Sequence, residues 1–125
     1  MMVGMGLGMV DRDIEVGKEY KIGTLTLNGV TYDRYVKVID FGALPNNNAK
    51  NVNTDITGDY HVLSIDGVAF NNNSGVMLPL PRVNSNATYM IDLYVYKTSS
   101  TNAIRLTTYT DLSSYMALVT LEYYK

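Results

Sequence analysis

The segment YMALVTLEYY, residues 115–124, alternates its side chains with a period of two residues. Successive side chains of a strand point to opposite faces of a sheet. One predicted face is apolar: Tyr115, Ala117, Val119, Leu121 and Tyr123. The other face is also largely apolar: Met116, Leu118, Thr120, Glu122 and Tyr124. A strand with two apolar faces is typical of a central position between two layers or inside an oligomer.

Elsewhere in the chain the same period recurs between turn signals, and no segment shows a sustained helical period. In residues 89–96, the side chains on the predicted inner face are Tyr89, Ile91, Leu93 and Val95. Their predicted outer face carries Met90, Asp92, Tyr94 and Tyr96. In residues 103–109, Ile104 and Leu106 alternate with Arg105 and Thr107. Both segments therefore predict strands.

Turn residues define where the other strands meet. Asn28-Gly29 lies between residues 24–28 and 31–41 and predicts a type I′ hairpin, since both turn positions must tolerate a positive φ. Asp66-Gly67 interrupts residues 60–70 and predicts a hairpin or a bulge. Pro79 cannot donate to a ladder, so residues 76–82 are expected at the edge of a sheet.

About eight short strands with frequent turns predict an all-β fold, either an antiparallel β-sandwich or a jelly-roll-like barrel. The length of 125 residues suits one domain. We expect a leader, linker or short shaft segment over residues 1–22 and the β-sandwich domain over residues 23–125. The first ten residues, MMVGMGLGMV, are too few to span a membrane and lack the basic flank of a signal peptide.

Composition excludes several functional classes. The chain has no cysteine, which rules out a disulfide scaffold, a thiol nucleophile and a cysteine-based zinc site. The net charge is -2 without a basic stripe, so we expect no nucleic-acid partner and no membrane insertion. The 11 tyrosines and the asparagine runs at 46–48 and 71–73 resemble the chemistry of binding loops. They also suit ordinary strands and turns.

Residues for catalysis or metal binding are sparse. His61 is the only histidine, and its place on an alternating segment favours a partly buried structural role over that of a catalytic base. The carboxylates are scattered over turns rather than paired as a glycosidase requires. Asp55 and Asp59 flank Gly58 but lack the series of an EF-hand loop. We therefore expect no enzyme, no catalytic residue, no bound metal and no cofactor.

Several short motifs follow one another in a recognisable order. They are EVGKEYKIGTLTLNGVTYDRYVKVI (15–39), KVIDFGALPNNNAKNVNTDI (37–56), IDGVAFNNNSGVMLPLPRV (65–83), MIDLYVY (90–96) and AIRLTTYTDLSSYMALVTLEYYK (103–125). This order resembles the C-terminal modules of tail fibres from phages and prophages of Gram-positive bacteria. Those modules share a GALPN turn, an LPLP strap and a terminal SSYxAxVxLEYxK strand. Leu25, Leu27 and the TGDYHV stretch (57–62) depart from the pattern, which affects the expected ligand more than the fold.

The resemblance implies a virion protein that is synthesised in the bacterial cytoplasm and forms a homotrimer in a bacteriophage tail fibre. It implies receptor binding and host attachment through a cell-surface glycan or protein, with surface polysaccharide, and hence carbohydrate binding, as our first expectation. It also implies contacts with other virion proteins. Two alternatives stay open: a purely structural fibre or head-fibre module, and a carbohydrate-binding domain of a cell-wall-associated protein.

The predicted outward face of two neighbouring strands supplies a candidate ligand-binding site. It consists of Asp92, Tyr94, Tyr96, Arg105 and Tyr109. Tyr94 and Tyr96 project from one face and are suited to stack on a sugar ring. Arg105 and Tyr109 share a parity on the next strand and complete the patch if the two strands pair. The same tyrosines also suit a subunit interface.

Overall fold

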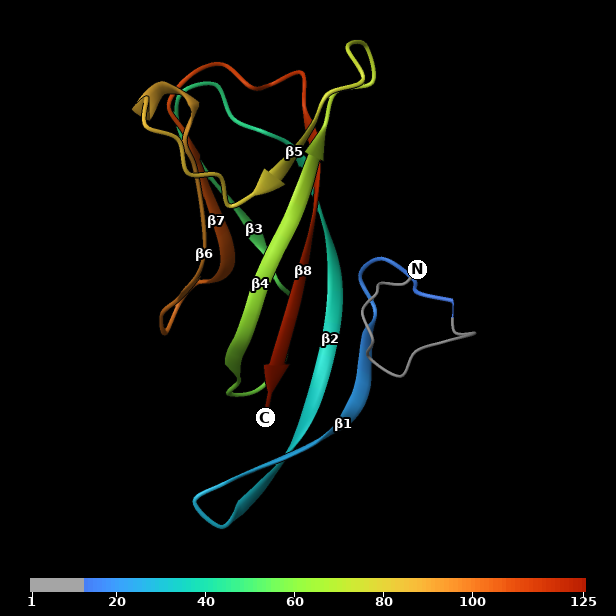
Figure 1. Cartoon of the computed structure of the whole chain (residues 1–125). Coiled ribbons are helices and arrows are strands. Elements are labelled where there is room, and N and C mark those ends of the chain that lie inside the picture. The colour runs from blue at the N-terminus through green and yellow to red at the C-terminus, as the bar shows by residue number, and fades with distance from the viewer. Residues whose placement is uncertain (1–12) are drawn as a thin grey trace.

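Two antiparallel sheets pack face to face in the computed structural model, which describes residues 13–125 (Figure 1). The strands are β1 (Glu19–Leu27), β2 (Val30–Ala43), β3 (Ala49–Asn53), β4 (His61–Phe70), β5 (Met77–Leu80), β6 (Ile91–Lys97), β7 (Asn102–Thr108) and β8 (Met116–Tyr124). One 3-10 turn, η1, spans Ala87–Tyr89. The large sheet has the order β1-β2-β8-β4-β5 and the small sheet the order β3-β7-β6. The predicted β-sandwich is confirmed.

Strand β8 occupies the centre of the large sheet, where it pairs with β2 on one side and β4 on the other. Its inner face is fully packed: Ala117, Val119, Leu121 and Tyr123. Strand β8 is therefore central within its sheet, whereas only one of its two apolar faces is covered by a second layer, and the alternative of a place inside an oligomer stays a prediction. Its outer face is not covered by the small sheet, and Met116 remains 42% exposed there.

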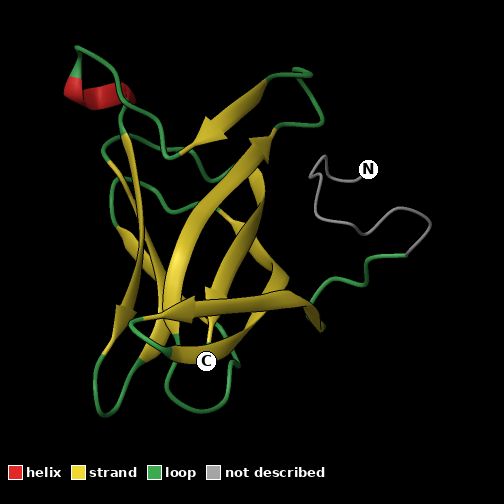
Figure 2. Ribbon diagram, turned by 60° about the horizontal axis from the view of Figure 1, so that its bottom comes forward, coloured by secondary structure: helices red, strands yellow, loops and turns green. Residues whose placement is uncertain are grey.

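The core lies between the two sheets and draws on both (Figure 2). The large sheet contributes Ile39, Phe41, Ala69, Leu80, Ala117, Val119, Leu121 and Tyr123, and the small sheet contributes Ile91, Leu93, Ile104 and Leu106. The alternation in residues 91–97 and 102–108 matches this packing, because every second side chain is buried against the large sheet. The periods predicted for these two strands are confirmed.

The hairpin turn at Asn28-Gly29 is confirmed. Leu27 pairs with Val30, and the two turn residues have φ values of 50° and 81°. Positive φ at both central positions is the requirement that favours this dipeptide. The resulting β1–β2 hairpin extends beyond the rest of the sandwich at the bottom of Figure 1. The edge position of residues 77–80 is confirmed as well, since β5 pairs only with β4 in the large sheet.

The hairpin or bulge predicted at Asp66-Gly67 is wrong. Strand β4 runs through both residues without interruption, and the bulge falls between Val62 and Ser64 instead. Gly67 has a different role. A Cβ atom at this position would lie 2.6 Å from the carbonyl oxygen of Leu118 on β8. Glycine is therefore needed for close approach of two backbones, not for a turn.

Two further predictions need correction. The alternation predicts Tyr89 at the start of a strand on the inner face, but Tyr89 lies in η1 and is 50% exposed. Asn86 caps this turn by accepting a hydrogen bond from Thr88 N, which favours the turn over an earlier start of the strand. The prediction of a partly buried His61 is also wrong, since His61 is exposed at the first position of β4. There its ring stacks on Tyr124 at 5.1 Å between centroids.

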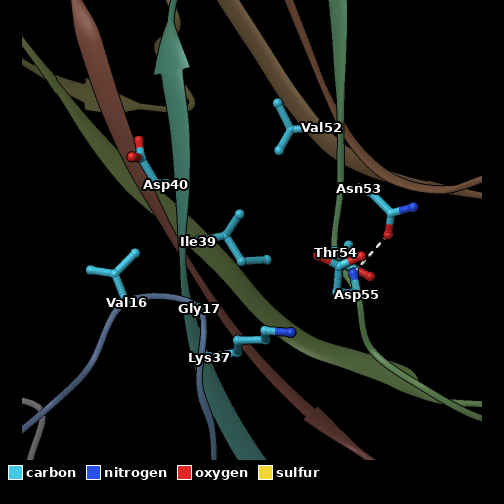
Figure 3. A pocket seen from close by; sticks show the side chains of 9 residues that line it. All are labelled: Val16, Gly17, Lys37, Ile39, Asp40, Val52, Asn53, Thr54 and Asp55. Atoms are coloured by element: carbon cyan, nitrogen blue, oxygen red, sulfur yellow. Dashed lines mark hydrogen bonds between the residues drawn. The ribbon is translucent and has the colours of Figure 1, made fainter.

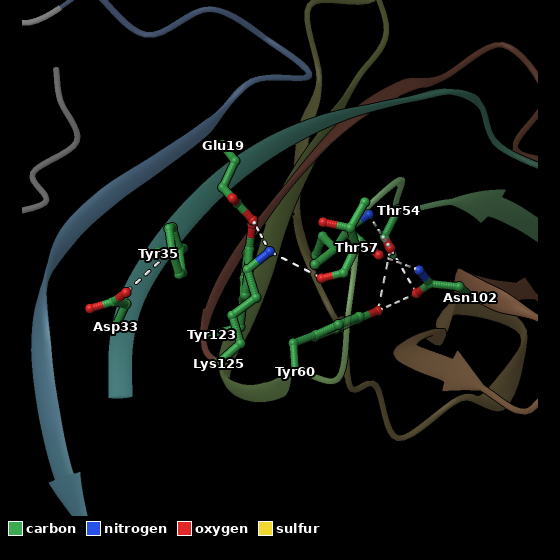
Figure 4. Close-up of polar contacts among 10 residues, drawn as sticks. Glu19, Asp33, Tyr35, Thr54, Thr57, Tyr60, Asn102, Tyr123 and Lys125 are labelled. Carbon is green, nitrogen blue, oxygen red and sulfur yellow. Dashed lines mark hydrogen bonds and ion pairs between the residues drawn. The ribbon is translucent and has the colours of Figure 1, made fainter. Parts of the chain in front are cut away.

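Polar contacts tie the connecting segments to the sheets at one end of the sandwich (Figure 4). Thr54 Oγ1 donates to Asn102 Oδ1 at 2.8 Å, and the Tyr60 hydroxyl donates to the same oxygen. Asn102 Nδ2 in turn donates to the carbonyl of Ile56 at 2.8 Å. These bonds satisfy polar groups that the fold buries, and they fix the loop between β3 and β4 against the start of β7.

A second set of polar contacts links the beginning and the end of the described chain. The Tyr123 hydroxyl donates to Glu19 Oε2 at 2.5 Å, and Lys125 Nζ lies 3.1 Å from the same oxygen. Burial raises the pKa of the Tyr123 phenol far above its ordinary value, and Glu19 raises it further. The phenol is therefore a neutral hydrogen-bond donor at physiological pH.

The first described residues already contact the large sheet. Strand β1 begins at Glu19, and Gly17 N donates to the Val38 carbonyl at 2.7 Å. The MMVGMGLGMV run lies outside the described residues, and the division into a segment 1–22 and a domain 23–125 stays a prediction. Within residues 13–125, no helix is long and apolar enough to cross a membrane.

Candidate functional site

The outer face of the small sheet carries the five residues predicted as a ligand-binding patch. Strand β6 pairs with β7 so that Tyr94 lies opposite Arg105 and Asp92 lies opposite Thr107. Asp92, Tyr94 and Tyr96 therefore project from β6 beside Arg105 on β7. Tyr109 follows directly after β7. The structure thus brings all five residues together, and we call this group the tyrosine face.

Direct contacts connect the members of the tyrosine face. The Arg105 guanidinium lies 4.3 Å from the centroid of the Tyr96 ring, within the range of a cation–π contact. At the other end, the Tyr109 hydroxyl donates to Asp92 Oδ2 at 2.6 Å. This hydrogen bond and the negative charge of Asp92 raise the pKa of the Tyr109 phenol. The phenol therefore stays protonated at physiological pH and keeps Asp92 in position.

The tyrosine face is open to solvent although the opposite face of the same sheet is core. The exposed fractions are 42% for Tyr94, 36% for Tyr96 and 42% for Tyr109. Three tyrosine rings exposed together on one sheet face are therefore accessible to a ligand or to another protein surface.

Strand β3 adds a residue that the sequence pattern does not single out. Asn51 lies opposite Arg105 in the β3–β7 ladder, and its Oδ1 accepts a hydrogen bond from Arg105 Nε at 2.9 Å. The contact orients the guanidinium over Tyr96. The signal for this strand is the alternation of Asn51, Val52 and Asn53, which is too short to stand out from the asparagine-rich loop before it.

The tyrosine face brings several kinds of side chain together. It combines aromatic rings with charged and amide groups that donate and accept hydrogen bonds, an arrangement that suits a hydroxyl-rich ligand. His61 lies elsewhere, on β4 of the large sheet, and stacks on Tyr124. In the described part of the chain, no group of three or more histidine, cysteine, aspartate or glutamate side chains is arranged to hold a metal ion.

The fold and this face define the molecule as an antiparallel β-sandwich that presents tyrosines on its smaller sheet. Comparison of the chain with protein-family models, with curated proteins and with solved structures finds no match. Function is therefore inferred from the residues and their geometry.

Proposed function

We propose that this domain is the receptor-binding module of a bacteriophage tail fibre and attaches the virion to a host surface polysaccharide. The observation that carries the proposal is the tyrosine face, where Tyr94, Tyr96 and Tyr109 are exposed together beside Arg105 and Asp92. The viral setting comes from the order of the sequence motifs. Binding, rather than catalysis, is the activity that this set of side chains supports.

Sugar rings have one relatively apolar face and a rim of hydroxyl groups. Tyr94 and Tyr96 offer aromatic surface to such a ring, and stacking of this kind contributes about 0.5–1.5 kcal/mol beyond burial. Arg105 and Asp92 offer a donor and an acceptor to hydroxyls at the rim. A single contact of this strength is weak, so the proposed module needs several copies acting together to hold a cell.

Support for several copies comes from a second exposed surface. On the outer face of the large sheet, Phe70 pairs with both Met116 on β8 and Met77 on β5, and Val68 pairs with Leu118. These five residues form the outer apolar patch. Within it, Met77 is 73%, Met116 42% and Val68 38% exposed. Soluble monomers seldom expose contiguous apolar surface of this kind. We therefore propose that other copies of the chain cover this patch in a homotrimer.

Multi-angle light scattering of the full chain at micromolar concentration tests the assembly. A mass of three chains is expected, because contact between copies buries the outer apolar patch. Met77→Lys with Met116→Lys places charges on the patch and is expected to shift the mass toward one chain. A wild-type mass of one chain would contradict the homotrimer.

The tyrosine face is tested by a Tyr94→Ala, Tyr96→Ala double variant. We expect at least a tenfold loss of adsorption to host cells, since about 0.5–1.5 kcal/mol per ring is removed from every copy in the assembly. Folding and mass are expected to stay unchanged, because both side chains point away from the core. Tyr89→Ala is the matched control, since Tyr89 is at least as exposed but lies on η1 outside the face.

The outcome also separates the receptor role from the structural alternative. Unchanged adsorption by the double variant would remove the tyrosine face from host recognition and leave the asparagine loops at 46–48 and 71–73 as candidates. Conversion of the double variant to single chains would place these tyrosines in a subunit interface and favour a structural fibre module. The outer apolar patch favours that alternative, because contact between copies of the chain would bury the patch whether or not the domain binds a receptor.

A further inference from the structure

The β1–β2 hairpin extends beyond the sandwich as a two-stranded arm over residues 25–32 (Figure 1). Strand β2 pairs with β8 only from Arg34 onward, and Asp33 exchanges two backbone hydrogen bonds with Lys125. The arm itself therefore has no third strand. A two-stranded hairpin is only marginally stable in water when nothing packs on it, so a contact on the arm would stabilise it.

The start of β1 differs from the arm, because it is covered by other parts of the chain. Tyr20 and Val36 form a small buried cluster there. Val16 and Gly17 lie beside β2, where they line one wall of a pocket (Figure 3). At the tip of the arm, by contrast, Leu27 is 40% and Val30 is 51% exposed.

The side chains of the arm divide into an apolar face and a polar face. Partners that lie directly opposite each other share a face. Leu25 lies opposite Tyr32 and Leu27 lies opposite Val30, and these four residues form the apolar face. Thr26 lies opposite Thr31 on the polar face, where the two hydroxyls hydrogen-bond at 2.9 Å. Contiguous apolar surface that stays exposed commonly marks a contact with another molecule.

The apolar face of the arm lies on the same side of the large sheet as the outer apolar patch. The Tyr32 ring meets the Tyr124 ring edge to face, with 4.9 Å between the centroids. Tyr124 and Met116 lie an even number of residues apart on β8, so their side chains point to the same side. Between them, Arg34 and Glu122 form an ion pair at 2.8 Å and neutralise each other. The two apolar surfaces therefore lie at opposite ends of one sheet face.

Interface size and charge indicate which partner suits the arm. A stable interface takes about 20–30 residues from each partner, whereas the outer apolar patch consists of five. Copies of the chain that cover the patch therefore need further contact surface, and the arm offers it on the same side of the sheet. The arm sequence LTLNGVTY (25–32) contains no charged residue, so two copies of it can approach without repulsion between like charges.

We propose that the arms of neighbouring copies pack on one another through their apolar faces and form a second contact of the assembly. This inference rests on the homotrimer of the proposed function. In a closed symmetric assembly every copy turns the same face toward the axis, and residues near the axis meet their own equivalents. Contact between the arms then buries Leu27 and Val30 of every copy.

Two carboxylates on the apolar face of the arm test this contact. Leu27→Glu with Val30→Glu changes two exposed positions, so each copy is expected to keep its fold by circular dichroism. We expect the three-chain fraction in light scattering at micromolar concentration to fall by about tenfold or more, because unpaired carboxylates are costly to bury. Thr26→Glu with Thr31→Glu is the matched control. It also places two glutamates opposite each other, but on the polar face, and is expected to keep the mass of three chains.

The outcomes separate the arm contact from the homotrimer itself. A mass of three chains for the Leu27→Glu, Val30→Glu variant would overturn the arm contact and leave the homotrimer in place. Equal loss of assembly in both arm variants would also overturn it, since the effect would then not depend on the apolar face. A wild-type mass of one chain would contradict the homotrimer and the arm contact together.

Disulfide formation supplies a second readout, because the chain contains no cysteine. A single Leu27→Cys exchange is expected to link two copies on air oxidation, seen as a two-chain band on a non-reducing gel. Thr26→Cys, on the polar face of the same strand, is the control and is expected to stay in single chains. Absence of the two-chain band from an assembled Leu27→Cys variant would exclude contact between arms. Linkage only after Leu27→Cys chains are mixed with Met116→Cys chains would place the arm on the outer apolar patch of a neighbour instead.

Discussion

Replacing Tyr123 by alanine is expected to lower the free energy of unfolding by about 3–5 kcal/mol, the usual cost of deleting a buried aromatic ring. Tyr123 is fully buried on β8 and lies between two other tyrosines. Its ring centroid is 5.8 Å from that of Tyr35 and 5.5 Å from that of Tyr60. Because domains are stable by only about 5–15 kcal/mol, this one exchange removes a large share of the total.

Urea unfolding followed by circular dichroism measures this loss. Tyr123→Phe is the matched control, since it keeps the ring and removes only the hydroxyl that donates to Glu19. Glu19 keeps its ion pair with Lys125 in that variant, so a cost of only about 1 kcal/mol is expected. A Tyr123→Ala variant within about 1 kcal/mol of the wild type would show that the ring is not central to the core.

Local patterns in the sequence are sufficient for strands β6, β7 and β8 and for the composition of the tyrosine face. The period of two in residues 115–124 predicts the strand and the two sets of side chains that share a face, because alternation is a property of the strand itself. The pairing of Asn28 with Gly29 predicts its turn for the same reason, since the requirement for positive φ lies within the two residues. Parity along residues 92–96 and 105–109 predicts which side chains share a face once β6 pairs with β7.

Features that depend on distant segments could not be predicted in this way. Nothing in the segment around Glu19 shows that its carboxylate pairs with Lys125, which is distant in the sequence. The role of Asn51 depends on the pairing of β3 with β7, two strands separated by three others.

Gly67 shows the same difference between local and distant causes, and it gives the second large effect. The dipeptide Asp66-Gly67 is a turn signal by local rules, yet β4 is continuous at this point. Gly67 pairs with Val119 on β8, and a Cβ atom would meet the carbonyl oxygen of Leu118 at 2.6 Å and the Cα of Val119 at 3.3 Å. Both contacts are to backbone atoms in the middle of the sheet, so neither can move without disturbing the β4–β8 ladder.

We therefore expect Gly67→Ala to destabilise the domain by about 2–3 kcal/mol in urea unfolding, at the upper end of the usual cost of overpacking. The sign of the effect is informative. Gly67 has no positive φ, and at such positions alanine normally stabilises by about 0.4–1 kcal/mol because it restricts the unfolded chain. Ser64→Ala, at an exposed position of the same strand, is the control and is expected to change stability by no more than about 0.5 kcal/mol. A neutral or stabilising Gly67→Ala exchange would mean that β8 can withdraw from β4 at this point, and the close backbone approach would then not be the reason for glycine.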